Sequence, residues 1–205
     1  MIKGFIFDFD GVLINTNKYH FTSWKKSLDL FNIDFNEKIY NKIKGLSRKT
    51  SLEILTYNND QILEDHKTEL LKKKNDIFLG LIKDLKSDDL MPGVKNFIAK
   101  FKNNHKIGVA SSSKNAEFIL KKINFDHCFD VIVDSNIIEE SKPNPKVFLK
   151  CVELLNLRPE DCIVFEDSKN GLLAAKKAGF FTYLVGNDEY RDFADKFIKD
   201  LTYYK

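Results

Sequence analysis

The stretch "FIFDFDGVLINTNKYH", residues 5–20, joins an apolar run to two aspartates, Asp8 and Asp10. The apolar run is typical of a buried strand, and the polar residues after it mark the strand's end. In open parallel sheets, ligands bind at the carboxyl ends of the strands. Two carboxylates this close repel each other, so either one holds a proton or a cation joins them. A simple turn is the alternative, because Asp-Gly is a common turn dipeptide.

A second acidic pair favours the cation over the turn. The segment "CIVFEDS" (162–168) is another apolar run, and it ends in Glu166 and Asp167. Two strands would therefore place carboxylates at one edge of the sheet. Hard oxygen ligands that leave positions open for water and phosphate suit Mg²⁺. The alternative for Asp167 is a cap on the helix that follows.

Two more strand ends carry groups that complement a phosphate. In "ASSSKN" (110–115), Ser111 follows a strand and precedes a helix, where hydroxyls and backbone N–H groups can bind an oxyanion. In "ESKPNP" (140–145), Lys142 can neutralise a phosphoryl oxygen, although a lone lysine before proline is usually a surface residue. No strand is followed by G-x-G-x-x-G, and the chain lacks G-x-x-x-x-G-K-[ST], so nucleotide binding by those routes is not supported.

The second half of the chain alternates strands with helices. Asn144 is a candidate N-cap with Pro145 at the first helical position, and Gly179 is a candidate C′ residue of a later helix. Nearly all-apolar strands between helices predict a parallel sheet covered on both faces. The predicted strands are residues 2–9, 106–113, 129–134, 162–167 and 181–186.

Residues 17–85 interrupt this pattern and are expected to be helical. Phe21, Trp24, Leu28 and Phe31 recur at helical spacing, and residues 62–85 have helical composition. Thr50 and Glu53 form a candidate capping box, which predicts a helix start just after Arg48. We therefore expect an α/β core of residues 1–16 and 86–205 with an inserted helical cap of residues 17–85. The end of the chain, "FADKFIKDLTYYK" (193–205), predicts no further helix and leaves the sheet's outer edge undefined.

Composition excludes several classes of protein. The 205 residues are 43% hydrophobic and 13% aromatic, which is ample for a folded core. The net charge of +3 is too mild for a nucleic-acid partner, and the cysteines and histidines lack metal-ligand spacing. No apolar run reaches membrane length, and the N-terminus lacks the layout of a secretory signal. We expect a cytoplasmic monomer with no membrane partner.

The four motifs together resemble a known superfamily. D-x-D-G after the first strand, then Ser111, Lys142-Pro143 and Glu166-Asp167, in this order, resemble the phosphotransferases of the haloacid dehalogenase superfamily. The resemblance implies a Rossmann-like parallel sheet. The helical insert, with "KGLSRKTSL" (44–52) and "KKKND" (72–76), is similar to the small cap of the β-phosphoglucomutase group.

The resemblance implies roles for the core residues. Asp8 would be the nucleophile, and Asp10 the general acid and base. The Asp8 carboxylate, the Asp10 carbonyl, Glu166 and Asp167 would hold one Mg²⁺. Ser111 and Lys142 would bind the transferring phosphate.

It also implies roles for the cap. His20 and Lys74 would couple substrate binding to Asp10, and Trp24 would line the sugar pocket, although from the residues alone Trp24 could equally be core. Arg48, at a helix N-terminus, would bind a second phosphate, unless it is an ordinary surface residue. The expected substrate-binding residues are His20, Trp24, Gly45, Leu46, Ser47, Arg48, Ser51, Lys74, Ser111, Ser112, Ser113, Lys114, Asn115 and Lys142.

The expected activity is a Mg²⁺-dependent phosphomutase that interconverts β-glucose 1-phosphate and glucose 6-phosphate, with glucose 1,6-bisphosphate as intermediate and activator. A sugar-phosphate phosphatase with water as the acceptor is the main alternative. A non-catalytic phosphate-binding protein is a third, and a nucleic-acid-binding module is the weakest.

Overall fold

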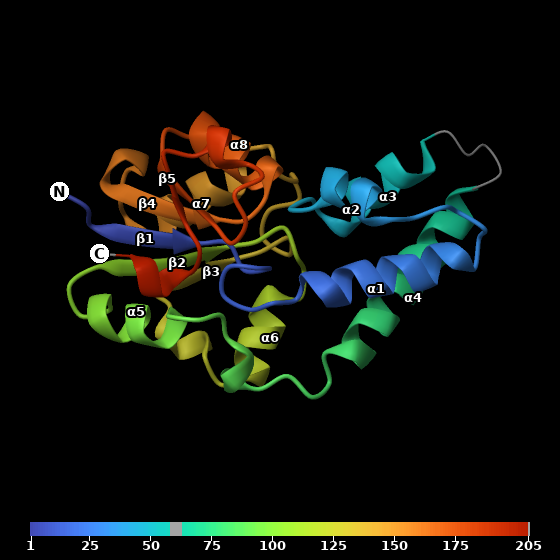
Figure 1. The fold of residues 1–205 in the computed structure, drawn as a ribbon, viewed down its shortest axis with the longest axis horizontal. Coiled ribbons are helices and arrows are strands. Elements are labelled where there is room, and N and C mark those ends of the chain that lie inside the picture. Colours follow the sequence, from blue (N-terminus) through green and yellow to red (C-terminus); the bar gives the residue numbers. More distant parts are fainter. Residues whose placement is uncertain (58–62, 205) are drawn as a thin grey trace.

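A single parallel sheet forms the core of the computed structural model, which describes residues 1–57 and 63–204. Its strand order is β3-β2-β1-β4-β5-β6, so β1 lies in the interior of the sheet (Figure 1). All five predicted strands are confirmed, and each is shorter than its apolar run. The strands are β1 (Gly4–Phe7), β2 (Lys106–Ala110), β3 (Val131–Val133), β4 (Cys162–Glu166), β5 (Phe181–Val185) and β6 (Lys196–Ile198).

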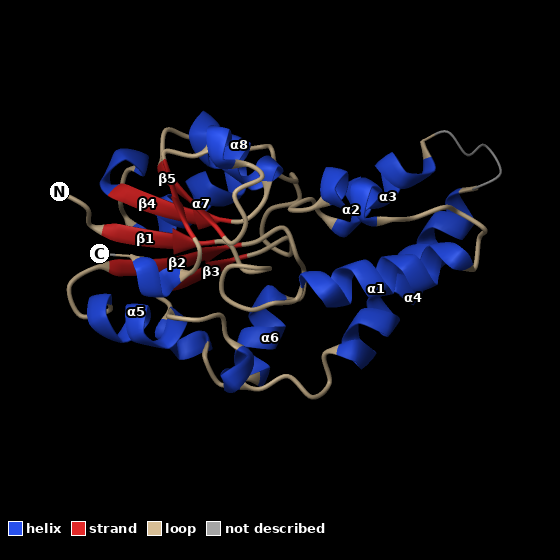
Figure 2. Ribbon diagram, viewed as in Figure 1, coloured by secondary structure: helices blue, strands red, loops and turns tan. Residues whose placement is uncertain are grey.

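Helices cover both faces of this sheet, as Figure 2 shows. Helices α5 (Val94–Phe101) and α6 (Ala116–Lys122) lie on one face, and α7 (Lys146–Leu155) and α8 (Lys169–Lys177) lie on the other. Because side chains alternate along a strand, Phe5 and Phe7 of β1 join the cluster of α5 and α6, whereas Ile6 joins that of α7 and α8. The predicted Rossmann-like α/β core is confirmed.

The sheet has an outer strand that the sequence did not predict. Strand β6 pairs in parallel with β5, and a short 3-10 helix (Leu201–Tyr203) follows it. Tyr204 then packs its ring 5.1 Å from that of Phe97 on α5. The strand has only three residues and lies among charged ones, so its apolar signal was too short to recognise.

Four helices follow β1 and pack on one another. They are α1 (Asn17–Asp29), α2 (Glu37–Ile43), α3 (Arg48–Thr56) and α4 (Glu64–Leu81). Helices α1 and α4 lie side by side (Figure 1), and Trp24, Leu28, Leu52 and Leu70 form a separate apolar cluster. We propose on this basis that residues 17–85 are a cap domain inserted into a core of residues 1–16 and 86–205. Ile62, the predicted start of the last helix, lies outside the described residues.

Two predicted helix starts are wrong by one residue. Ser47, and not the Thr50–Glu53 box, caps α3, because its side chain accepts a hydrogen bond from the Thr50 N–H at 3.2 Å. Pro145 is the N-cap of α7, whereas Asn144 Oδ1 accepts a bond from the Lys146 N–H at 3.0 Å. Gly179 is confirmed at the end of α8, where its φ of 85° suits glycine. Among the described residues, no helix combines the length and apolarity that a membrane span requires.

Candidate active site

The ends of the central strands bring the core groups together. The Asp8 N–H donates to the Phe165 carbonyl at 2.9 Å, and the Ser111 N–H donates to the Val133 carbonyl at 2.9 Å. Both residues therefore continue the hydrogen bonding of their strands. Because all strands run in parallel, these residues meet at one edge of the sheet. Asp8 is only 4% exposed there.

Lys142 is the buried cation of this edge. Its Nζ lies 2.5 Å from Asp8 Oδ1 and 3.6 Å from Glu166 Oε2, and it also donates to the Ala110 carbonyl at 3.2 Å. Burial alone would lower the pKa of Lys142, but the charges of Asp8 and Glu166 raise it. Burial and the Glu166 charge raise the pKa of Asp8 well above its usual value, although Lys142 opposes this.

The same edge fits a divalent cation. Asp8, Glu166 and Asp167 each offer an oxygen, and these atoms lie within 4.8 Å of one another. Glu166 Oε2 is buried and has no hydrogen-bond partner among the described residues. Gly171 makes room for Glu166, because a Cβ there would lie 1.8 Å from Oε1. An all-oxygen set with an unsatisfied carboxylate oxygen suits Mg²⁺. Ser168 caps α8, so Asp167 is not its helix cap.

Asp10 faces away from this cluster, toward the cap. Its Oδ1 accepts a hydrogen bond from the Thr16 hydroxyl and lies 3.2 Å from His20 Nε2. Burial would raise the pKa of Asp10, but the His20 charge and the hydrogen bonds from His20 and Thr16 lower it below its usual value. These contacts favour the carboxylate form of Asp10, whereas the acid role implied by the resemblance needs a proton on Asp10.

His20 links Asp10 to the cap lysine. Lys74 Nζ lies 2.8 Å from His20 Nδ1. Burial and the Lys74 charge lower the pKa of His20, and burial and Arg48 lower the pKa of Lys74 to about 7. A neutral His20 satisfies both contacts, since Lys74 donates to Nδ1 and Nε2–H donates to Asp10. The three side chains thus form a hydrogen-bonded chain from α4 to the core.

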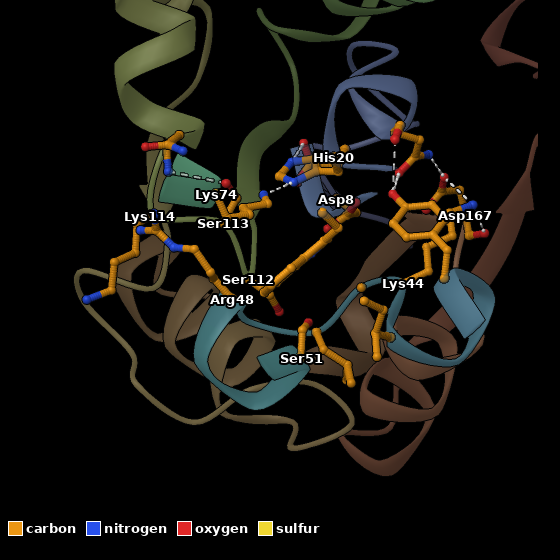
Figure 3. A pocket seen from close by; sticks show the side chains of 18 residues that line it. Asp8, His20, Lys44, Arg48, Ser51, Lys74, Ser112, Ser113, Lys114 and Asp167 are labelled. Atoms are coloured by element: carbon orange, nitrogen blue, oxygen red, sulfur yellow. Dashed lines mark hydrogen bonds and ion pairs between the residues drawn. The ribbon is translucent and has the colours of Figure 1, made fainter. Parts of the chain in front are cut away.

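One pocket lies between the acidic edge and the cap (Figure 3). The predicted residues that line it are Asp8, Asp10, His20, Trp24, Gly45, Leu46, Arg48, Ser51, Lys74, Ser112, Ser113, Lys114, Asn115 and Asp167. Four predicted residues do not line it. Ser111, Lys142 and Glu166 are buried, and the Ser47 side chain caps α3.

The structure adds Asn17, Tyr40, Ile43 and Lys44 to the pocket lining. Asn17 and Lys44 lie within the quoted stretches 5–20 and 44–52 but were given no role, and no motif marks Tyr40 and Ile43. Tyr40, Ile43 and Lys44 are spaced by three and four positions near α2, so helical periodicity could have placed them on one face. It could not have shown that this face meets the core.

The structure places two cap residues whose roles the sequence left open. Trp24 is 3% exposed and belongs to the cap's apolar cluster, and it also lines the pocket. Its contact with a sugar stays a prediction. Arg48 also lines the pocket, and its Nη1 donates to the Leu71 carbonyl at 3.4 Å, so it is no ordinary surface residue.

The cap touches the core at separate points. The Ser47 N–H donates to Ser141 Oγ at 2.7 Å, and Asn115 Nδ2 donates to Asn75 Oδ1 at 3.0 Å. Lys44 Nζ lies 2.8 Å from Asp167 Oδ2. The cap therefore closes over the acidic edge.

A parallel sheet with an acidic edge and a helical cap defines a class of phosphate-handling enzymes. Residues 5–185 match the haloacid dehalogenase-like hydrolases, and the chain belongs to this family. The chain is 38% identical over 192 residues to the β-phosphoglucomutase of Bacillus subtilis, covering 92% of this chain and 85% of that protein. The crystal structure of a β-phosphoglucomutase from Clostridium difficile superposes with a TM-score of 0.94 at 34% identity, covering 100% of this chain and 94% of the other.

Phosphatases are also among the relatives. The chain is 31% identical over 183 residues to a phosphorylated carbohydrates phosphatase of Thermotoga maritima, covering 87% of this chain and 82% of that protein. The chain is thus an enzyme of the haloacid dehalogenase superfamily, similar to both mutases and phosphatases of phosphorylated sugars.

Proposed function

We propose that this enzyme is a Mg²⁺-dependent phosphomutase that interconverts β-D-glucose 1-phosphate and glucose 6-phosphate. The observation that supports it is a cation on each side of the pocket, one buried behind its core wall and one in its cap lining. Lys142 lies behind Asp8 on the core side, and Arg48, the first residue of α3, lines the pocket on the cap side. A phosphatase needs one phosphate site, whereas a mutase must hold glucose 1,6-bisphosphate by both phosphates.

The core edge would carry the phosphoryl transfer. A carboxylate oxygen of Asp8 attacks phosphorus, an aspartyl phosphate forms, and the bond from phosphorus to the sugar oxygen breaks. Bound Mg²⁺, held by Asp8, the Asp10 carbonyl, Glu166 and Asp167, would neutralise charge on the transferring group. Lys142 and Ser111 hold the same group from the side of β2 and β3.

Asp10 would handle the proton. It protonates the leaving sugar oxygen, and as a carboxylate it later accepts the proton of the hydroxyl that attacks the aspartyl phosphate. Its contacts with Thr16 and His20 favour the carboxylate form, which is the form that accepts the proton of the attacking hydroxyl. Because His20 is bound to Lys74, a substrate phosphate that contacts the cap can influence the protonation of Asp10.

The cap would decide between sugar and water as the acceptor. Ser112, Ser113 and Lys114 of one core loop face the cap residues Arg48 and Ser51 across the pocket (Figure 3), and Asn115 and Trp24 also line this pocket. A closed cap excludes water from the aspartyl phosphate, and it must open for the bisphosphate to turn over.

The test supplies β-glucose 1-phosphate, Mg²⁺ and a trace of glucose 1,6-bisphosphate, and follows glucose 6-phosphate and free phosphate together. We expect glucose 6-phosphate with little free phosphate. Release of phosphate in step with substrate loss would contradict the mutase and support the phosphatase.

Arg48→Ala makes the test specific to the second phosphate site. Loss of a charged hydrogen-bonding partner should lower kcat/KM by about 10- to 100-fold. Lys49→Ala removes the same charge from the neighbouring exposed position and should change kcat/KM little. Equal effects of the two variants would indicate a general charge effect in place of a phosphate site at Arg48.

A further inference from the structure

Asp167 has contacts that the phosphoryl-transfer steps do not explain. Its Oδ2 accepts a hydrogen bond from Asn17 Nδ2 at 2.8 Å and lies 2.8 Å from Lys44 Nζ. Asn17 is the first residue of α1, at the junction between core and cap. Both contacts engage one oxygen of the carboxylate, so the other oxygen is left for a different partner.

Tyr40 fixes the orientation of Asn17. Its hydroxyl lies 3.2 Å from both the main-chain carbonyl and the Oδ1 of Asn17. A carboxylate only accepts hydrogen bonds, so the amide nitrogen must face Asp167. The amide oxygen must then face Tyr40, whose hydroxyl donates. The chain Tyr40–Asn17–Asp167 therefore has one consistent direction, from the cap helix α2 to the core.

The turn beneath this chain is shaped to let it form. Gly11 has a φ of 89°, and a Cβ there would lie 1.9 Å from Asp167 Oδ2 and 2.3 Å from Asn17 Nδ2. The hydrogen bond between the two side chains thus passes directly over Gly11. The Asp10-Gly11 turn, Asn17 and Asp167 form one packed unit beside the acidic cluster.

We propose that Asn17 and Tyr40 are positioning residues for the cation site. By holding Oδ2 of Asp167, they present its other oxygen to the site shared with Asp8 and Glu166. Because Asn17 and Tyr40 both belong to the cap and Asp167 belongs to the core, this orientation is complete only when the cap is closed. Cap closure strengthens cation binding, and by reciprocity the cation stabilises the closed cap. The inference rests on the Mg²⁺ site of the proposed function.

The experiment measures Mg²⁺ binding by calorimetry, without substrate, for the wild type, Asn17→Ala, Tyr40→Phe and the double variant. Partners behind a metal ligand typically change metal affinity 10- to 100-fold, and we expect Asn17→Ala to weaken binding about 10-fold. Tyr40→Phe removes one neutral hydrogen-bond donor and should weaken binding about 3-fold. Because Tyr40 acts through Asn17, the double variant should bind no more weakly than Asn17→Ala.

Tyr19→Phe is the matched control, since it removes a phenol hydroxyl from α1, at a residue packed against the core, and should leave Mg²⁺ binding unchanged. Wild-type affinity in Asn17→Ala, or additive effects in the double variant, would overturn the inference. If Asn17→Ala fails to fold, Tyr40→Phe decides alone, because it keeps the ring in place. Absence of Mg²⁺ binding in the wild type, or unchanged binding in Asp167→Asn, would instead count against the proposed cation site itself.

Discussion

The core edge and the cap face each other across the pocket, but they are built differently. At the core edge, Asp8, Lys142 and Glu166 are buried and are placed by the ends of adjacent strands and the loops that follow them. On the cap, His20, Arg48 and Lys74 come from three separate helices. The core charges are therefore fixed by the fold itself. The cap charges depend on helix packing and on a few hydrogen bonds that an opening motion can break.

Because of this difference, the core charges contribute to the stability of the fold, whereas the cap charges can respond to pH. Lys142 is fully buried against two carboxylates, so its charge is part of the folded state. Lys74 is also buried, but its pKa of about 7 means that it can lose its proton without unfolding. We infer that mutations at the core edge act mainly on stability and turnover together. Mutations in the cap should change pH dependence and substrate binding with less effect on folding.

The largest expected effect follows from removing the buried cation. Lys142→Met leaves Asp8 and Glu166 facing each other without a partner, and breaking a buried ion pair in this way costs about 3–5 kcal/mol. The measurement is the free energy of unfolding by urea in the absence of divalent cations. Addition of Glu166→Gln should recover part of the loss, because it removes one of the uncompensated charges.

Lys150→Met is the control on the surface of α7. Its ion pair with Glu153 is 31% and 65% exposed, and such a pair contributes at most about 1 kcal/mol. If Lys142→Met were no more destabilising than Lys150→Met, the core edge would not be the fixed part of the site, and the contrast with the cap would fail.

The two regions also differ in what the sequence could predict. Asp8, Ser111 and Glu166 follow strand-like runs, and parallel strands that end at one edge bring such residues together. The cap residues His20, Arg48 and Lys74 were expected in the site from the resemblance, because helical spacing alone cannot show which face of a helix meets the core. Lys44 reaches Asp167, 123 positions later in the chain, because the end of α2 docks on the core, and Tyr40 reaches Asp167 only through Asn17. Strand β6 was missed for a different reason, since its three residues lie among charged neighbours.

The next largest effect concerns the pH dependence of stability and comes from Lys74. The pKa of Lys74 is about 7 in the folded protein, whereas the usual pKa of a lysine is 10.5. Between pH 7 and pH 10.5 the unfolded chain therefore binds more protons than the folded protein. The Lys74 contribution to the free energy of unfolding therefore rises with pH from about 7 upward. The slope approaches about 1.4 kcal/mol per pH unit.

The measurement compares urea unfolding of the wild type and Lys74→Met between pH 6 and pH 9.5. The difference between the two proteins should be constant below pH 7 and should then move in favour of the wild type. The exposed neighbour Lys72 provides the control, since Lys72→Met should give no such trend. A parallel pair of curves for the wild type and Lys74→Met would show that Lys74 is not held in a site that disfavours its charge.

The smallest effect is expected where the two regions meet, at Thr16. Its hydroxyl donates to Asp10 Oδ1 and so favours the carboxylate form, which helps to lower the pKa of Asp10. Thr16→Val keeps the shape of this fully buried side chain but removes the donor, so the pKa of Asp10 should rise, while the other hydrogen bond, from His20, remains. The ¹³C chemical shift of the Asp10 carboxyl, followed through a pH titration, reports this directly. Activity that needs the Asp10 carboxylate should fall off at a correspondingly higher pH on the acid side.

Thr16→Ser retains the donor and should titrate like the wild type. An unchanged pKa of Asp10 in Thr16→Val would mean that the Thr16 hydroxyl does not set the charge of Asp10. The protonation of Asp10 would then be set by the cap residue His20.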